Sequence, residues 1–313
     1  MIPVLDTDAW VEKLLSTRRS AEGKILAFYE HRMGAICRDP RLLLMPADDH
    51  LAHRGDGVFE SMKYEGRRLY QLDAHLERIE RSARGIHLTS PCTREVMRNI
   101  VLEVARAADV DNGCIRILLG RGPGGFGIDP AECPVPSLYV VAYSLSPKPD
   151  AWYDKGVTAF RTSIPAKQGY LATIKNANYI PNVLMKLEAR ERGCDIPVSF
   201  DADDHIAEGP TENLCLVDSA GTLVVPEFTN ALSGTTIMRV IDMIKGEMPV
   251  AFRQVREDEL YTAAEVMVLG TTTECVSVVA FEGQPLGGGK PGPVARKFRN
   301  LLRKDLVENG VRF

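Results

Sequence analysis

Apolar residues recur along this chain with two different periods, and together these periods predict a mixture of helices and strands. Spacings of three and four residues predict helices at 72–84, 93–108, 179–192 and 294–308, and another that begins near 237. Short apolar runs between turn-forming residues predict strands at 24–29, 41–45, 58–63, 68–71, 114–120, 138–144, 156–162, 196–200, 206–208, 214–217, 223–226, 266–270 and 276–280. The chain is therefore expected to fold as an α+β protein.

The predicted helix at 179–192 has an apolar side and a charged side. Its apolar side consists of Tyr179, Ile180, Val183, Leu184 and Leu187. Its charged side consists of Lys186, Glu188, Arg190, Glu191 and Arg192. We expect the charged side to face solvent, the apolar side to pack inward, and Gly193 to end the helix.

The first residues predict a short amphipathic helix at about 6–18, without the basic start and apolar centre of a signal peptide. Its apolar side, which we expect to face inward, consists of Trp10, Val11, Leu14 and Leu15.

A chain of 313 residues can form two domains. The segment at 144–153 has two prolines and no apolar period, which is typical of a boundary. We therefore expect an N-terminal α/β domain at 1–146, a linker at 147–153 and a C-terminal domain at 154–313.

Composition narrows the function without identifying it. Hydrophobic residues make up 45% and charged residues 26% of the chain, as in ordinary globular proteins. The formal net charge of −4 gives no broad basic surface for nucleic acid, and no apolar run approaches the roughly 18 residues of a membrane-spanning helix. The seven cysteines include no C-x-x-C pair, which favours free thiols in a reducing, cytoplasmic compartment.

Lys175 and Glu208 are the first candidates for chemistry. Lys175 stands just before the helix at 179–192, where a long amine can point into a cleft, although most lysines in such places are solvated. A desolvated lysine amine can form a Schiff base with an aldehyde. Glu208 ends a predicted strand at a Gly-Pro break; it could form a surface ion pair or hold a pyridine nitrogen protonated. Spacing alone does not decide between these interpretations.

Two arginines interrupt or end a predicted strand of Ile and Leu. An inward Arg116 needs an anion, which could be a substrate carboxylate or a carboxylate of the protein, and Arg121 at the end of the strand could have either partner. The loop at 120–129 is rich in glycine but lacks the GK[ST] ending of a nucleotide-binding loop, so we interpret it as a flexible active-site loop. His50 and His53 have no third ligand nearby, and we expect no metal site.

Threonines follow two predicted turns. Gly234, Thr235 and Thr236 precede a helix, whose free backbone N–H groups could bind phosphate, although Thr is also an ordinary helix cap. Three threonines at 271–273 follow a buried strand and could be simple strand formers.

The segments at 162–189 and 205–214 together resemble the fold-type IV, or class IV, pyridoxal-phosphate aminotransferases. The K-x-x-N-Y pattern of that family stands here at 175–179, and its E-G-x-x-x-N pattern stands at 208–213. The blocks DDHLAHRGDGVFE, GPGGF and TSIPAKQGYLATIKNANYIPNVLMKLEA are most similar to its D-amino-acid aminotransferase and aminodeoxychorismate lyase-like members.

The resemblance implies a role for each residue of a site that binds pyridoxal 5′-phosphate. Lys175 would form the Schiff base and act as the general base, and Glu208 would face the ring nitrogen. Arg78 and the threonines would bind the phosphate, Tyr179 would contact the phenolic oxygen, and Leu232 would pack against the ring. The full set of other cofactor-binding residues would be Arg78, Tyr179, Thr211, Asn213, Leu232, Thr235, Thr236, Thr271 and Thr272. The implied substrate-binding residues are Phe59, Arg116, Arg121, Thr272 and Thr273.

The resemblance also implies a fold and an activity. The fold would be a small N-terminal α/β domain and a larger C-terminal β-barrel-like domain with helices, with the cofactor between them, in a homodimer. The activity would be ping-pong transfer of an amino group between an amino acid, with D-alanine or D-glutamate favoured, and a 2-oxo acid. Phe59 replaces a tyrosine of D-amino-acid aminotransferases, and Phe59 with Arg116 also fits branched-chain L-amino-acid aminotransferases. Pyruvate elimination from 4-amino-4-deoxychorismate, and a non-catalytic binding protein with this fold, also stay open.

Overall fold

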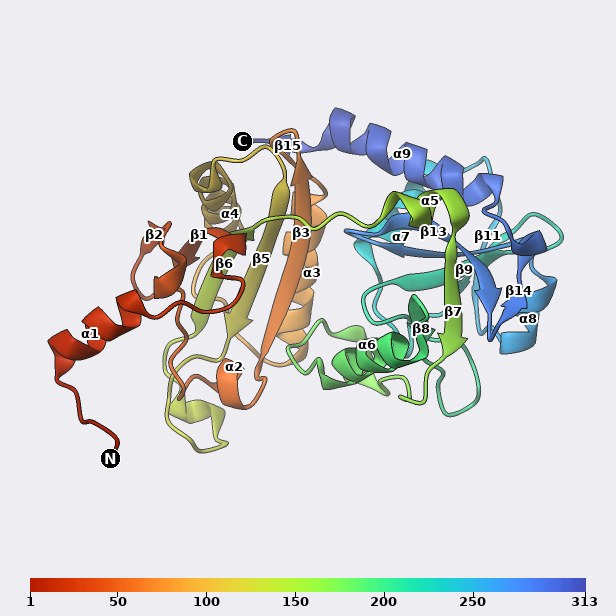
Figure 1. The fold of residues 1–313 in the computed structure, drawn as a ribbon. Coiled ribbons are helices and arrows are strands. Elements are labelled where there is room, and N and C mark those ends of the chain that lie inside the picture. The colour runs from red at the N-terminus through yellow and green to blue at the C-terminus, as the bar shows by residue number, and fades with distance from the viewer.

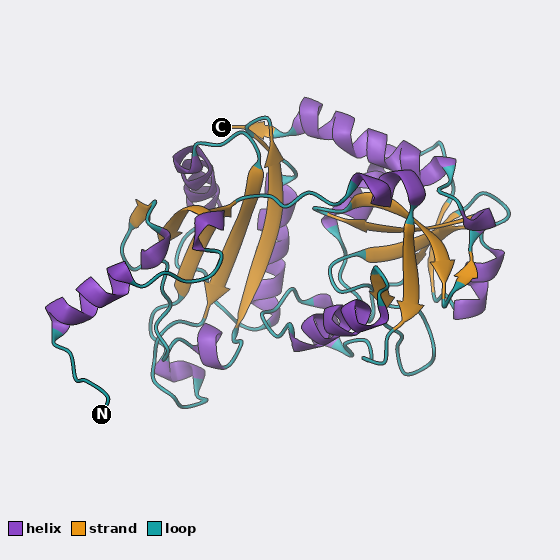
Figure 2. Ribbon diagram, viewed as in Figure 1, coloured by secondary structure: helices purple, strands orange, loops and turns teal.

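The computed structural model describes all residues from 1 to 313. Its strands form two sheets that lie side by side (Figures 1 and 2). Helices and strands occur together, as the two apolar periods predict, and the α+β fold class is confirmed. No helix has the length and apolar character that a membrane span requires.

The first sheet has seven strands in the order β15-β4-β3-β5-β6-β1-β2, and each neighbouring pair is antiparallel. The strands are β1 (Ile25–Glu30), β2 (Ala35–Cys37), β3 (Gly57–Glu65), β4 (Arg68–Leu69), β5 (Gly113–Gly120), β6 (Ser137–Tyr143) and β15 (Val311–Arg312). Because β15 pairs with β4, the end of the chain returns to the first sheet. The division of the chain at 147–153 remains a prediction.

Two amphipathic helices, α3 (Leu72–Gly85) and α4 (Arg94–Ala108), cover one face of the first sheet (Figure 1). Their apolar sides pack against the strands, so that Leu76 of α3 and Val101 of α4 share a buried core with Val58 of β3. Both helices lie within two residues of their predicted ranges, because a sustained period and a clear terminus, such as the Thr93 cap of α4, define them locally.

The second sheet has the strand order β11-β10-β9-β12-β13-β7-β8, with β14 paired to β13. The strands are β7 (Val157–Arg161), β8 (Ile196–Val198), β9 (Asn213–Val217), β10 (Leu223–Pro226), β11 (Val250–Arg253), β12 (Glu265–Gly270), β13 (Glu274–Phe281) and β14 (Gln284–Pro285). The helices on this side of the molecule are α5 (Asp150–Lys155), α6 (Ile180–Arg192), α7 (Thr235–Met243), α8 (Glu257–Thr262) and α9 (Pro293–Asn309). Both faces of the sheet are buried: Leu214 and Leu216 point into one core, and Cys215 and Val217 into the other, beneath α7 and α9.

The expected orientation of α6 is wrong. Ile180 is 73% exposed and Val183 63% exposed, and Leu184 and Leu187 are exposed as well. Polar groups hold the opposite side of the helix instead, because the side-chain amide of Asn182 donates to the Pro210 carbonyl at 2.6 Å. The structure thus leaves an apolar stripe on α6 uncovered.

Two further expectations near the N-terminus are wrong. The first helix, α1 (Thr7–Ser16), extends away from the sheets, and its Trp10 is 66% exposed, so its apolar side does not face inward (Figure 1). The segment predicted as a strand at 41–45 contains the end of a 3₁₀ turn, because Asp39 caps the turn and Pro40 fixes its first dihedral angle.

Candidate active site

A cavity of about 260 Å³ lies between the two sheets. It is lined by most of the residues that the sequence singled out: Phe59, Arg78, Arg116, Lys175, Tyr179, Glu208, Thr211, Asn213, Leu232, Thr235, Thr236, Thr271 and Thr272. Ser61, Tyr143 and Glu212 also line it and were not predicted. The cavity therefore brings together side chains that lie far apart in the sequence.

The backbone of Lys175 docks on the first sheet although the residue belongs to the second half of the chain. The amide of Phe59 donates to the Lys175 carbonyl oxygen at 3.0 Å, and the amide of Lys175 donates to the Ser82 hydroxyl at 3.2 Å. One residue further on, Asn176 forms an isolated bridge with Val58. These bonds place the lysine side chain beside Phe59, at the boundary between the two sheets.

The side chain of Lys175 lines the cavity, and its amine has no carboxylate within ion-pair distance. Its Nζ lies 3.2 Å from the Tyr179 hydroxyl and 4.6 Å from the centre of the Phe59 ring. Desolvation of the amine, together with the neighbouring Arg78 guanidinium, lowers the pKa of Lys175 to about 8, against the opposing effect of Glu60 and Glu208. A substantial fraction of the amine is therefore neutral near physiological pH, as a nucleophile or a general base requires.

Tyr179 connects this amine to the rest of the cavity. Its ring meets the Phe59 ring edge-on, with 4.8 Å between their centres. Burial and the nearby Glu208 carboxylate raise the pKa of Tyr179, so its hydroxyl stays protonated and can donate a hydrogen bond.

Glu208 and Asn213 hold the peptide of Leu232 from both sides. The amide of Leu232 donates to Oε2 of Glu208 at 3.0 Å, and Nδ2 of Asn213 donates to the Leu232 carbonyl oxygen at 2.8 Å. Burial raises the pKa of Glu208, opposed by its bond to Leu232 and by the cations around it. The E-G-x-x-x-N pattern thus positions a carboxylate in the cavity and fixes the loop that carries Leu232.

Arg78 is held by a buried acid that sequence reasoning missed. Nε and Nη2 of Arg78 donate to the two carboxylate oxygens of Glu60 at 2.6 and 2.8 Å, and His75 Nδ1 lies 2.7 Å from the same carboxylate. Burial alone would raise the pKa of Glu60, but Arg78 and His75 outweigh it and hold that pKa below its ordinary value. The signal was present in the sequence, because Glu60 alternates with Val58 and Met62 on the core side of β3.

Arg78 is also directed toward the start of α7. Its Nη1 donates to the Ser233 carbonyl oxygen at 3.3 Å, and the free N–H groups of the first turn of α7 begin at Thr235. Gly234 is required at this turn, because a Cβ there would lie 1.9 Å from Oδ1 of Asn213. A guanidinium, a helix N-terminus and the threonine hydroxyls at 235, 236, 271 and 272 therefore border one end of the cavity, as an anionic phosphate requires.

Arg116 of β5 and Arg121, the residue after β5, have different partners. Arg116 lies over the Phe59 ring at 5.1 Å and the Tyr143 ring at 6.0 Å, lines the cavity and has no ion pair. Arg121 lies outside the cavity, because Asp56 binds it at 2.9 and 3.0 Å and the carbonyls at 86 and 87 take its remaining donors. The expectation that Arg121 binds substrate is therefore corrected.

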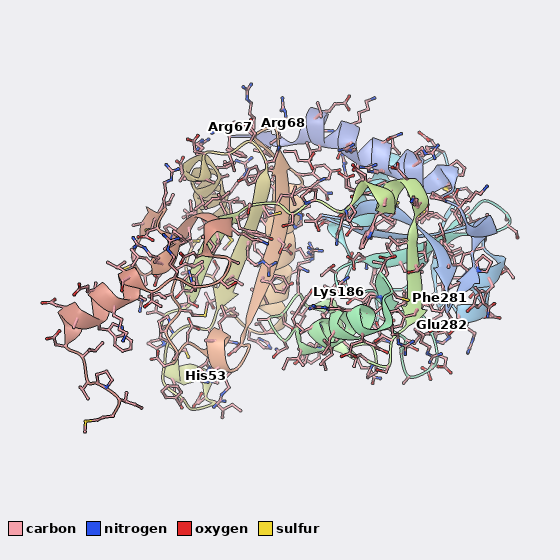
Figure 3. All side chains as sticks on the ribbon, in the orientation of Figure 1. His53, Arg67, Arg68, Lys186, Phe281 and Glu282 are labelled. Carbon is pink, nitrogen blue, oxygen red and sulfur yellow. The ribbon has the colours of Figure 1, made fainter.

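One other expectation is corrected as well. Thr273 does not line the cavity, since its buried hydroxyl donates to the Glu212 carboxylate at 3.2 Å. No residue of the loop at 120–129 lines the cavity of this chain, and its role as an active-site loop stays a prediction. That loop lies at one end of the first sheet, where Nε2 of His53, labelled in Figure 3, is 3.1 Å from the Gly125 carbonyl oxygen.

The residues present fit pyridoxal 5′-phosphate. The cofactor needs an amine for its aldehyde, a carboxylate for its ring nitrogen and a cationic seat for its phosphate. Lys175, Glu208 and Arg78 supply these three groups, and all three line the same cavity.

Comparison with known proteins gives the chain a family and several relatives. Residues 57–281 match the family model described as amino-transferase class IV. The chain is 33% identical over 316 residues to a chloroplastic D-amino-acid transaminase of Arabidopsis thaliana, and the match covers 97% of this chain and 82% of that protein.

Solved structures share the fold. A branched-chain amino acid aminotransferase of T.th., with pyridoxamine 5′-phosphate, superposes with a TM-score of 0.85 at 25% identity over 91% of this chain and 95% of the other. The 4-amino-4-deoxychorismate lyase of Pseudomonas aeruginosa superposes with a TM-score of 0.77 at 26% identity over 89% of this chain and 99% of the other.

Proposed function

This chain belongs to the class IV aminotransferases, and we propose that it transfers amino groups between D-amino acids, such as D-alanine and D-glutamate, and 2-oxo acids in a ping-pong reaction. The observation that carries the proposal is the desolvated amine of Lys175, with its lowered pKa, in a cavity that it shares with Arg78 and Glu208. The preference for D-amino acids is supported by the similarity to the D-amino-acid transaminase of Arabidopsis thaliana.

The cofactor is pyridoxal 5′-phosphate. When bound, it supplies an aldehyde that captures amines and a ring that withdraws electrons from the substrate's α-carbon. In the proposed arrangement Arg78, Thr235 and Thr236 bind the phosphate with the free N–H groups of α7. Thr271 and Thr272 would also bind the phosphate, and Leu232 would pack against the ring.

Three residues of the cavity hold or move a proton in the proposed mechanism. Lys175, once its amine is free and neutral, would move the proton from the substrate's α-carbon to the cofactor carbon that carried the aldehyde, and would move it in the opposite direction in the second half-reaction. Glu208 binds the protonated ring nitrogen through a charge-assisted hydrogen bond. Tyr179 would donate a hydrogen bond from its hydroxyl to the ring's phenolic oxygen.

Arg116 is the proposed binding group for the substrate carboxylate. It is a cation of β5 that has aromatic neighbours and no acid, and Phe59 beside it has no hydroxyl to share this task. Thr272 also lines the cavity and is proposed to contribute its backbone N–H.

A panel of D- and L-alanine, glutamate, leucine and valine, with pyruvate and 2-oxoglutarate as acceptors, tests the proposal. We expect turnover of D-alanine and D-glutamate and a strict requirement for an acceptor. Strong turnover of L-leucine with none of D-alanine would instead support the branched-chain activity, which the T.th. structure and the Phe59–Arg116 pair favour. Release of pyruvate from 4-amino-4-deoxychorismate without an acceptor would support the lyase activity suggested by the Pseudomonas aeruginosa structure.

We further propose that the enzyme is a cytoplasmic homodimer. The exposed apolar stripe of α6, with Ile180 and Val183, supports an assembly that covers it. All seven cysteines are unpaired, which supports a reducing compartment. Light scattering should give twice the mass of one chain, and a Val183→Glu substitution should shift the protein to a single chain.

A further inference from the structure

Lys167 is a second half-buried lysine beside the cavity, and none of the roles described above involves it. It lies in the segment between β7 and α6, which is anchored one residue earlier by a hydrogen bond of 3.0 Å from the Ala166 amide to the Phe200 carbonyl oxygen. Its ammonium group lies 4.4 Å from the centre of the Tyr179 ring. The chain offers this ammonium group no side-chain hydrogen bond and no ion pair, so the aromatic face is its main partner.

Lys167 reaches the cavity only through another residue. Lys167 does not line the cavity, whereas Tyr179 does, and Lys167 approaches through the ring of Tyr179. Lys175 lies 5.6 Å from the centre of the same ring and bonds to its hydroxyl. The two amines are therefore within about 10 Å of each other, with one tyrosine as their common neighbour.

We propose that Lys167 is a positioning residue that holds the Tyr179 ring and, through its positive charge, lowers the proton affinity of the Tyr179–Lys175 pair. A cation over an aromatic face restrains the ring and is attracted to its electrons. Placed near an ammonium group, the same cation disfavours the protonated form. The charge of Lys167 therefore favours a neutral Lys175 amine, and the restrained ring keeps the Tyr179 hydroxyl aimed at its hydrogen-bond partner.

Four other charged groups also act on Lys175 and Tyr179. They are the cations Arg78 and Arg116 and the acids Glu60 and Glu208. Glu60 is paired with Arg78, whereas Glu208 also acts on Lys167. Burial lowers the pKa of Lys167 itself, against the effect of Glu208.

The test compares Lys167→Met, Lys167→Gln and Lys167→Arg with the wild type in two titrations. The first measures the rate at which the apoenzyme takes up pyridoxal phosphate as a function of pH, which reports the neutral fraction of Lys175. The second measures the visible absorbance of the holoenzyme as a function of pH. Lys290→Met, which removes one exposed positive charge from a surface loop that does not line the cavity, is the matched control.

We expect both midpoints to rise by roughly half a unit in Lys167→Met and Lys167→Gln, because the coupling across about 10 Å is weakened by the solvent that reaches Lys167. Lys167→Arg and Lys290→Met should keep the wild-type midpoints. Unchanged midpoints in both neutral variants would overturn the proposal, even if their activity fell, because the proposed role acts through charge.

The inference rests on the role proposed for Lys175, and the two can fail separately. A wild-type enzyme that takes up no pyridoxal phosphate would overturn both. A wild-type titration with a clear midpoint that the Lys167 variants share would overturn only the role of Lys167.

Discussion

At the Arg78 end of the cavity the buried charges have partners of opposite sign, whereas at the Lys175 end the cations have none. Glu60 binds both Arg78 and His75 within 2.8 Å. Lys175 and Arg116 instead lie against the rings of Phe59, Tyr179 and Tyr143. Aromatic faces stabilise a cation by about 0.5–2 kcal/mol and leave it free to bind or react.

This difference separates two uses of charge in one site. A buried ion pair fixes geometry, because breaking it leaves an uncompensated charge in the interior. An unpaired cation in a cavity is available to a ligand, and its pKa moves with its surroundings. The comparison predicts that substitutions at the paired end reduce stability and that substitutions at the unpaired end reduce activity.

The largest effect is expected for Lys175→Ala. Without this amine the chain loses both its bond to the cofactor and its general base, so transamination should fall by at least about 10⁴-fold. The unfolding free energy should stay close to that of the wild type, because an amine with no acid partner contributes little to stability. Lys245→Ala, an exposed lysine after α7, should keep full activity, and equal losses in the two variants would contradict the comparison.

Glu60→Ala tests the paired end. Removing this carboxylate leaves Arg78 without its partner in the interior, so we expect the unfolding free energy to fall by about 3 kcal/mol in urea titrations. Glu77→Ala, at an exposed position of α3, should change it by less than about 0.5 kcal/mol. If Glu60→Ala kept the unfolding free energy of the wild type, the ion pair between Glu60 and Arg78 would not be what stabilises this end of the cavity.

Arg116 and Arg121 give a sharper version of the same test. Arg116→Met removes an unpaired cation, so KM for the amino acid should rise roughly 10- to 100-fold, the value of one lost charge-assisted hydrogen bond. Arg121→Met removes a cation paired with Asp56 and should lower the melting temperature with little change in KM. A raised KM in Arg121→Met, with only a lowered melting temperature in Arg116→Met, would reverse the roles assigned to the two arginines.

The smallest expected effect is the dependence of the rate of cofactor uptake on pH. Because the pKa of Lys175 is lowered to about 8 from an ordinary value of 10.5, half of its amine is neutral at about pH 8. Only the neutral amine attacks an aldehyde, so the rate of cofactor uptake should rise with pH and level off above a midpoint near 8. A midpoint close to that of an ordinary lysine would show that burial does not act on this amine.

The sequence predicted most of the elements because their signals are local. The helices α3 and α4 and the strands β5, β9 and β12 follow from periods and turns within a few residues. Most of the expected site residues line one cavity, because the family resemblance that assigns them implies a single ligand that they bind together. The threonine at 273 was misplaced because its place in the turn between β12 and β13 directs its hydroxyl to Glu212, which no local pattern reveals.

The failures have a common physical origin in long-range contacts. The apolar period of α6 resembles that of α3, but Asn182 bonds to Pro210 and fixes the other side of α6 inward. The strand pattern could have marked Glu60 as a buried acid, but not its partners, which lie on another element 15 and 18 residues further along the chain. A pattern within one segment cannot reveal what the opposite surface offers.

Reduction of the holoenzyme with borohydride, followed by peptide mass mapping, tests the central claim most directly. The reduction makes the bond between the cofactor and its lysine permanent, so the modified peptide identifies the reacting amine. We expect a single phosphopyridoxyl group on Lys175. A group on Lys167 or Lys186, with Lys175 unmodified, would contradict the account of this site.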